Sequence, residues 1–125
     1  MAASDKISRF EDLIAWQKAR TLTRQIYVIS RKGNFGNDRA LASQIQRAST
    51  SIMSNIAEGF DRGGNREFHH FLVIAKGSCA EVRSQLYIAF DAGYLDQSEF
   101  NDLLQRAEEV GRIIGGLRAS VDHRR

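Results

Sequence analysis

The chain has 125 residues, of which 42% are hydrophobic and 26% charged, a balance typical of one globular domain with a single core. It contains no proline and one cysteine, which favours long helices with short connections and excludes an internal disulfide. The net charge of +3 is compatible with nucleic-acid binding but does not require it.

A first helix is predicted over residues 9–31. Ser8 and Glu11 have the spacing of a capping box, in which each side chain bonds the backbone amide of the other residue. The apolar residues that follow recur at helical spacing. They are Ala15, Ala19, Leu22, Ile26 and Ile29.

A second helix is predicted over residues 38–58, after a turn in the glycine- and asparagine-rich segment 33–37. Asn37 or Asp38 can cap its first turn, and Gly59 is placed to end it. Its apolar positions repeat as in the seam of a helical bundle. They are Leu41, Ile45, Ala48, Ile52 and Ile56.

Two further helices are predicted over residues 66–92 and 97–121. Asn65 is a candidate N-cap for the first, and Gly93 is placed to end it. The segment from Asp96 to Glu99 matches a second capping box. The two seams run through Phe68, Leu72, Ala75, Cys79, Val82, Leu86 and Phe90, and through Phe100, Leu103, Ala107, Val110, Ile114 and Leu117.

Four helices with short connections predict an all-α fold, an antiparallel up-down-up-down four-helix bundle. We expect a single domain over residues 1–125, with disordered tails at 1–7 and 122–125. No apolar run approaches the roughly 20 residues needed to cross a bilayer. The first residues also lack the apolar segment of a signal peptide. We therefore expect a cytoplasmic protein without a membrane partner.

Several polar or small residues lie at or near the apolar seams, with Asn55 at a seam position and Arg47 and Glu58 beside the seam. Three interpretations remain open: these residues fix the register within the bundle, they belong to an interface between subunits, or they have a catalytic role. The residues are Arg47, Asn55, Glu58, Gly77, Ser78 and Glu81.

Arg47 and Glu58 lie on one helix face, roughly 16 Å apart along the axis, so each needs another partner. Antiparallel packing about the loop near residue 62 would set Arg47 level with Ser78. The sequence thus predicts an ion pair between Arg47 and Glu81, and a contact from Glu58 to the amides or arginines at the start of the next helix.

The chain resembles the bacterial family of proteins encoded within intervening sequences of 23S ribosomal RNA genes. The resemblance covers about residues 10–117 and depends on a set of short segments. These are Phe10-Glu11-Asp12-Leu13, Trp16-Gln17, Gln44-Ile45-Gln46-Arg47-Ala48, Ser51-Ile52, Asn55-Ile56-Ala57-Glu58-Gly59, Phe68, Phe71-Leu72, Ala75-Lys76-Gly77-Ser78, Glu81 and Gly93-Tyr94-Leu95.

This resemblance implies a four-helix bundle that assembles as a ring-like homo-oligomer, a homopentamer. It also implies similarity to the accessory variability determinant of diversity-generating retroelements, a basic pentamer that works with a reverse transcriptase and its RNA. No enzymatic activity is established for the family. The resemblance therefore implies a non-enzymatic protein, with itself, RNA and a reverse transcriptase as expected partners.

A basic stripe along the first helix is the candidate nucleic-acid-binding site. Arg20, Arg24, Tyr27 and Arg31 follow one helix face, and arginine beside an exposed aromatic ring suits single-stranded RNA. The alternative is a solvated face with Tyr27 packed on the core. Arg62 and Arg66 add positive charge near the loop between the second and third helices.

The sequence gives little support for a catalytic or metal-binding site. Glu67 and His70 form one Glu-x-x-His motif, but a di-iron bundle needs two such motifs and further carboxylates. Cys79 lies on an apolar seam and is expected to be a buried, inert thiol. We therefore expect no cofactor and no enzymatic activity. The sequence favours a homo-oligomer that binds RNA or another nucleic acid, with a scaffold that binds another protein as the alternative.

Overall fold

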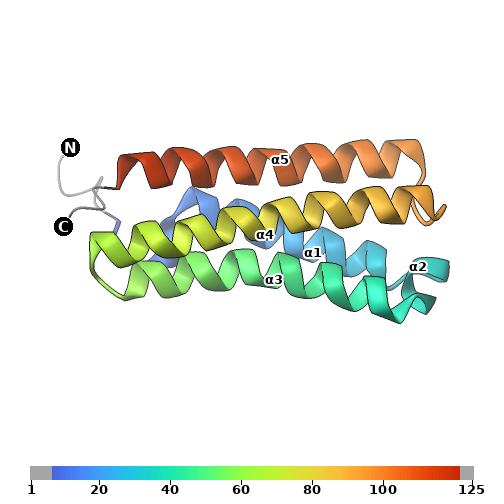
Figure 1. The fold of residues 1–125 in the computed structure, drawn as a ribbon, viewed down its shortest axis with the longest axis horizontal. Helices are drawn as coiled ribbons and strands as arrows, with labels where there is room; N and C mark the ends of the chain where they lie inside the picture. Colours follow the sequence, from blue (N-terminus) through green and yellow to red (C-terminus); the bar gives the residue numbers. More distant parts are fainter. Residues whose placement is uncertain (1–6, 122–125) are drawn as a thin grey trace.

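The computed structural model describes residues 7–121, and all regular structure in this range is helical (Figure 1). The predicted all-α fold is confirmed. Of the tails predicted at residues 1–7 and 122–125, residues 1–6 and 122–125 lie outside the described range, and Ile7 has no regular structure. A 3-10 helix, η2 (Phe10–Asp12), precedes five α-helices. These are α1 (Ile14–Ser30), α2 (Gly33–Asn37), α3 (Arg39–Asp61), α4 (Asn65–Asp91) and α5 (Gln97–Ser120).

The four long helices lie side by side and alternate in direction along the chain (Figure 1). Helix α4 packs against α3 and α5, and α1 packs against the same two helices. Consequently α1 and α4 occupy opposite sides of the molecule, and each keeps an outward face.

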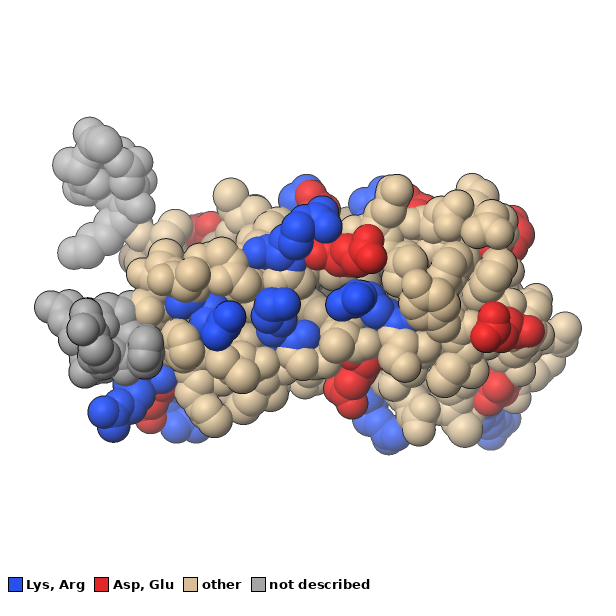
Figure 2. All heavy atoms as spheres, turned by 45° about the horizontal axis from the view of Figure 1, so that its top comes forward, with Lys and Arg blue, Asp and Glu red and all other residues tan. Residues whose placement is uncertain are grey.

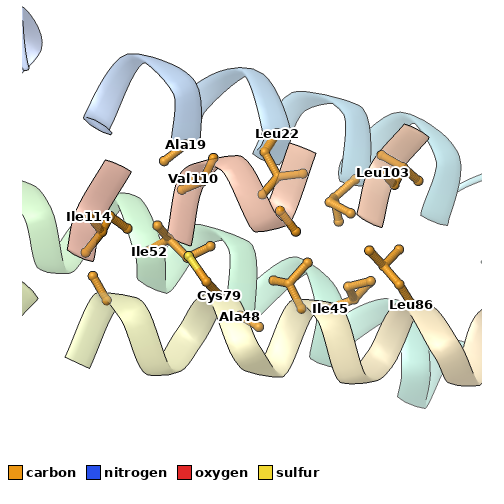
Figure 3. Close-up of a cluster of buried hydrophobic side chains, with 14 of the residues drawn as sticks. Ala19, Leu22, Ile45, Ala48, Ile52, Cys79, Leu86, Leu103, Val110 and Ile114 are labelled. Carbon is orange, nitrogen blue, oxygen red and sulfur yellow. The ribbon is translucent and has the colours of Figure 1, made fainter. Parts of the chain in front are cut away.

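The core runs along the middle of the four long helices (Figure 3). Each helix contributes side chains, among them Leu22, Ile52, Leu86 and Val110, which are at most 1% exposed. The apolar seam predicted for the second helix is buried at every position. Hydrophobic periodicity therefore identified the core face of this helix.

The chain enters the first helix differently from the prediction. Helix α1 begins at Ile14 instead of near residue 9, and no side chain caps η2. The backbone is extended at Arg9 and again at Leu13, so the capping box predicted at Ser8 does not form. This path buries Leu13 and sets the Phe10 ring edge-on against Trp16, with ring centroids 5.2 Å apart. Apolar burial thus outweighs continuation of the helix.

The turn predicted over residues 33–37 is instead the short helix α2. Phe35 is 2% exposed and stacks on Tyr94, with ring centroids 5.4 Å apart. Asp38 then caps α3 as predicted, because its carboxylate accepts a 3.1 Å hydrogen bond from the amide of Leu41.

Gly59 does not end its helix, contrary to the prediction, because α3 continues to Asp61. A Cβ atom added at Gly59 would lie 2.6 Å from the Cβ of Phe71 on α4. The glycine therefore allows α3 and α4 to approach closely, and this close contact favours continuation of the helix.

At the ends of α4, one prediction is wrong and one is confirmed. Asn65 is the first helical residue and not the cap, because Gly64 takes the cap position without a side-chain hydrogen bond. Gly93 ends the helix region with a φ of 83°, and the Tyr94 amide donates a 2.9 Å hydrogen bond to the Ala89 carbonyl, as in a Schellman motif. The predicted capping box at Asp96 is also present, with both of its hydrogen bonds.

Candidate nucleic-acid interface

The predicted basic stripe lies on the outward face of α1. Arg20, Arg24 and Arg31 are exposed, while Ala19, Leu22 and Ile26 bury the opposite face of the helix. Tyr27 is half-buried, and its hydroxyl lies 3.4 Å from the Thr50 hydroxyl on α3. The structure thus brings the three arginines together on one face, with Tyr27 at the edge of that face toward α3.

Polar contacts to α3 fix the rotation of α1 about its axis. The Thr23 hydroxyl lies 3.1 Å from the Ser49 carbonyl, to which it can donate, and 2.8 Å from the Ala19 carbonyl in its own helix. The Gln46 amide donates a 2.9 Å hydrogen bond to the buried Ser30 hydroxyl. These bonds satisfy polar groups between the two helices and keep the arginines on the solvent side.

The arginines of the stripe keep their charge available. Within residues 7–121, no acidic side chain lies within 4.0 Å of Arg20, Arg24 or Arg31 in an ion pair. The Arg20 guanidinium lies 5.8 Å from the centre of the Trp16 ring, which orients it without neutralising it. Such exposed and unpaired guanidinium groups are suited to bidentate contacts with phosphate.

Arg62 and Arg66 differ in their surroundings. Arg62 donates a 2.7 Å hydrogen bond to Glu58 and lies 3.5 Å from Glu67, so it links the two helix ends across the loop. The hydrogen bond that Arg62 donates to Glu58 is the main reason that the pKa of Arg62 is raised. Arg66 is exposed, and no described carboxylate pairs with it. Glu58 therefore meets an arginine as predicted, but in the loop and not in the next helix.

The predicted ion pair between Arg47 and Glu81 is absent from the described part of the chain. Both residues are exposed and line one shallow hollow between α3 and α4, with no ion pair within 4.0 Å. Ser51 and not Arg47 lies level with Ser78, since their hydroxyls share a 2.9 Å hydrogen bond. The register is thus offset by one helical turn from the prediction, in keeping with the longer α3.

Asn55 and Ser78 belong to a small polar network within the protomer. The Asn55 amide donates to the carbonyl and the hydroxyl of Ser51, at 2.8 and 3.0 Å. Ser78 is 5% exposed and lies in the contact between α3 and α4. Gly77, in contrast, points outward, and an added Cβ atom would have no neighbour within 4 Å.

A second group of cations was missed by the sequence analysis. Lys76, Arg83 and Arg112 line a hollow of about 270 Å³ between α4 and α5, together with Glu108. Figure 2 shows Lys and Arg side chains in a row along the side of the molecule where α5 comes forward. No described carboxylate forms an ion pair with any of the three. Their proximity depends on the register of two helices, and no single stretch of sequence indicates it.

Cys79 lies at the bottom of this hollow and is 2% exposed. Burial raises the pKa of its thiol to about 12, although Lys76 and Arg83 lower it in part. The thiol is therefore protonated and a poor nucleophile near neutral pH.

The described residues were also surveyed for metal ligands and membrane-spanning segments. Between residues 7 and 121, no three His, Cys, Asp or Glu side chains are grouped closely enough to hold a metal ion. Over the same range, no helix combines the length and the apolar character needed to cross a membrane.

Comparison with known proteins identifies one matching sequence family and a fold neighbour. The sequence pattern of the family described as 23S rRNA-intervening sequence protein matches residues 11–116. A crystal structure of a protein of unknown function from the S23 ribosomal protein family of Bacteroides thetaiotaomicron superimposes with a TM-score of 0.77. That chain is 19% identical in sequence, and the match covers 86% of the present chain and 100% of the other. Among proteins of curated function, none matches the chain significantly.

Proposed function

Because the chain belongs to the family of 23S rRNA-intervening sequence proteins, we propose that it is a non-enzymatic, homo-oligomeric protein that binds RNA through the α1 arginines. One observation carries the RNA-binding proposal: Arg20, Arg24 and Arg31 are exposed on one helix face without ion-pair partners in the described chain. Phosphate groups are the ligands that such a row of guanidinium groups fits best.

The protomer of this assembly is an antiparallel up-down-up-down four-helix bundle in our proposal. The alternating direction of the four long helices and their shared core support this class (Figure 1). The ring-like assembly, a pentamer, is supported by the apolar side chains that α4 leaves exposed, because large apolar patches on a surface mark interfaces. Light scattering tests it: a mass near that of one chain, 14.1 kDa, would contradict assembly.

The RNA-binding proposal is tested by fluorescence anisotropy with labelled single-stranded and structured RNA. We expect salt-dependent binding with a dissociation constant below about 10 µM at low salt. The variant Arg20→Ala/Arg31→Ala should bind about tenfold more weakly, with a smaller dependence on salt, because two phosphate contacts per protomer are lost.

A matched control removes the same charge from arginines that are already paired. Arg9 lies 3.5 Å from Asp12, and Arg106 lies 3.2 Å from Asp102. The variant Arg9→Ala/Arg106→Ala should therefore bind RNA nearly as well as the wild-type protein. Equal losses in both variants, or no salt-dependent binding by the wild-type protein, would contradict the assignment to α1.

A scaffold that binds another protein is the second candidate function, and the exposed apolar face of α4 favours it. A reverse transcriptase as this partner, and the likeness to the accessory variability determinant, stay predictions of the resemblance. Affinity purification after nuclease treatment distinguishes the two functions. A stoichiometric protein partner that survives the nuclease supports the scaffold, whereas its loss with the RNA supports RNA binding.

A further inference from the structure

The large apolar side chains that remain exposed within the described helices gather on two of them. Helix α1 exposes Ile14 and Val28, and α4 exposes four residues. Those of α4 are Val73, Ile74, Tyr87 and Ile88. Because α1 and α4 pack against the same two helices and not against each other, these faces lie on different sides of the molecule. We call them the α1 face and the α4 face.

The α4 face has small residues between its two apolar ends. Gly77, Ala80 and Ser84 are exposed there, and the exposed Glu81 lies on the same line, seven residues from both Ile74 and Ile88. Glycine in a helix interior costs about 1 kcal/mol relative to alanine, and no atom of the described chain lies within 4 Å of a Cβ added at Gly77. No contact within the protomer therefore requires this glycine. Its lack of a side chain leaves room for another molecule to approach the helix closely at this position.

The α1 face borders a hollow of about 250 Å³ between α1 and α5. It is lined by the apolar side chains of Val28, Ile29 and Leu103 and by the polar residues Arg24, Gln25, Glu99 and Asp102. The hollow can receive a side chain that protrudes from a neighbouring helix.

The two faces match in spacing. Ile14 and Val28 are fourteen residues apart on α1, and so are Ile74 and Ile88 on α4. This separation is roughly 21 Å along each helix axis. Two helices laid side by side can therefore bring both pairs of apolar side chains into contact at once.

The charges at the edges of the faces are complementary as well. Arg83 lies beside the α4 face on the side of α5 and has no ion-pair partner in the described chain. The hollow beside the α1 face is lined by Glu99, which has no ion-pair partner in the described chain, and by Asp102, whose carboxylate accepts hydrogen bonds from Arg106. Opposite charges at the rim of an apolar contact favour one orientation of the partners over others.

We propose that the α4 face of one chain docks on the α1 face and its hollow in a second copy of the same chain. The contact joins two different surfaces, so it is head-to-tail, and repetition through a closing rotation gives a ring. The proposal rests on the homo-oligomer proposed above and assigns its surfaces. Tyr87 is exposed beside Ile88 at one end of the α4 face, and its ring packs edge-on against Phe100 with centroids 5.0 Å apart, so it is suited to anchor the contact.

The test uses two variants, each of which disables one face. Val28→Asp places a charge in the α1 face, and Ile74→Asp places one in the α4 face; both side chains are exposed, so the fold should tolerate the change. We expect each variant alone to have the mass of one chain by light scattering. An equimolar mixture should form a species of two chains, because each variant retains the face that the other has lost.

The control is Ser54→Asp, which adds the same charge to an exposed position of α3 outside both faces and should keep the wild-type mass. Circular dichroism checks that the variants are folded. Gly77→Leu provides a second disruption of the α4 face, with a residue of higher helix propensity.

The possible failures are distinguishable. A wild-type mass of one chain would contradict both the homo-oligomer and this contact. An oligomeric wild-type protein whose Val28→Asp and Ile74→Asp variants keep their mass would overturn only the contact. Monomeric variants that do not associate when mixed would show that the interface is not head-to-tail.

Discussion

Gly59 and Gly116 are both glycines within helices, but their surroundings are opposite. A Cβ atom at Gly59 would meet Phe71 at 2.6 Å, whereas one at Gly116 would have no neighbour within 4 Å. The first glycine is needed for the packing of α3 on α4. Nothing within the described chain requires the second, which lowers the helix propensity of α5.

Alanine substitutions should therefore have effects of opposite sign. Gly59→Ala is expected to lower the free energy of unfolding by about 1–3 kcal/mol through overpacking against α4. Gly116→Ala is expected to raise it by up to about 1 kcal/mol. Urea unfolding followed by circular dichroism measures both changes, and a stabilising Gly59→Ala would refute the close contact.

Cys79 supplies a prediction about pH. Burial raises the pKa of the folded thiol to about 12, above its ordinary value of 9.0. The stability that the neutral thiol contributes is thus fully present below about pH 9 and is lost as the pH rises from there toward 12. Cys79→Ala should remove this part of the alkaline decline in urea unfolding.

The same thiol should react slowly in the folded protein. At pH 8 we expect alkylation on the order of a thousandfold slower than in 8 M urea, because the thiolate is scarce. Equal rates in the two solutions would mean that the thiol is accessible.

Single residues also mark the limit of prediction from sequence. The seam residues Ile45, Ile52 and Ile56 were predicted to be buried, and each is 0% exposed. The sequence predicts that Glu58 contacts an arginine or a backbone amide, but it does not identify Arg62 as the partner. The predicted pairing of Arg47 with Glu81 is wrong. Periodicity depends on one helix, whereas an ion pair depends on the register of two helices to within one turn.

At the scale of elements, Asp38 joins three parts of the fold. One carboxylate oxygen caps α3 through the Leu41 amide, and the other accepts a 2.8 Å hydrogen bond from the Tyr94 hydroxyl in the turn between α4 and α5. This hydrogen bond is the main reason that the pKa of Tyr94 is raised. The Tyr94 ring in turn stacks on Phe35 of α2.

Asp38→Ala should therefore lower the free energy of unfolding by about 1–2 kcal/mol, the usual effect of a lost N-cap. Asp38→Asn retains a capping oxygen and should lose less. Tyr94→Phe removes only the hydrogen bond from the Tyr94 hydroxyl to Asp38. Its effect on stability therefore separates the contribution of this bond from that of the helix cap. Thermal unfolding compares the three variants, and an unchanged midpoint in Asp38→Ala would refute the capping role.

Elements whose signals are local were predicted well. The capping box at Asp96 and the glycine end at Gly93 both depend on residues within one or two turns, and both are present. The capping box predicted at Ser8 is absent, and residues 33–37, predicted to form a turn, form helix α2. In both cases a distant contact decides the outcome, through the burial of Leu13 and of Phe35.

At the scale of the whole molecule, the charge distribution should couple RNA binding to assembly. One chain carries a net charge of only +3. Copies held together repeat the α1 stripe on one particle, and an RNA strand can then contact several stripes at once.

A monomeric variant should therefore bind RNA more weakly even when its stripe is intact. Ile74 lies on α4, on the side of the chain opposite the stripe. Any loss of RNA affinity in Ile74→Asp must therefore act through assembly. Anisotropy titrations over a range of KCl concentrations should give a smaller salt dependence for Ile74→Asp than for Ser54→Asp, which carries the same charge. Identical salt dependence in the two variants would show that one chain binds RNA on its own.

The alternating direction of the four long helices has a consequence for engineering. Helix α1 begins and α5 finishes at the same end of the molecule (Figure 1). In a ring with cyclic symmetry, the corresponding ends of all copies lie on one rim. A short flexible linker could then connect each copy to the next, so that a whole ring is encoded as one polypeptide. Such a chain would allow a substitution to be placed in a single chosen copy.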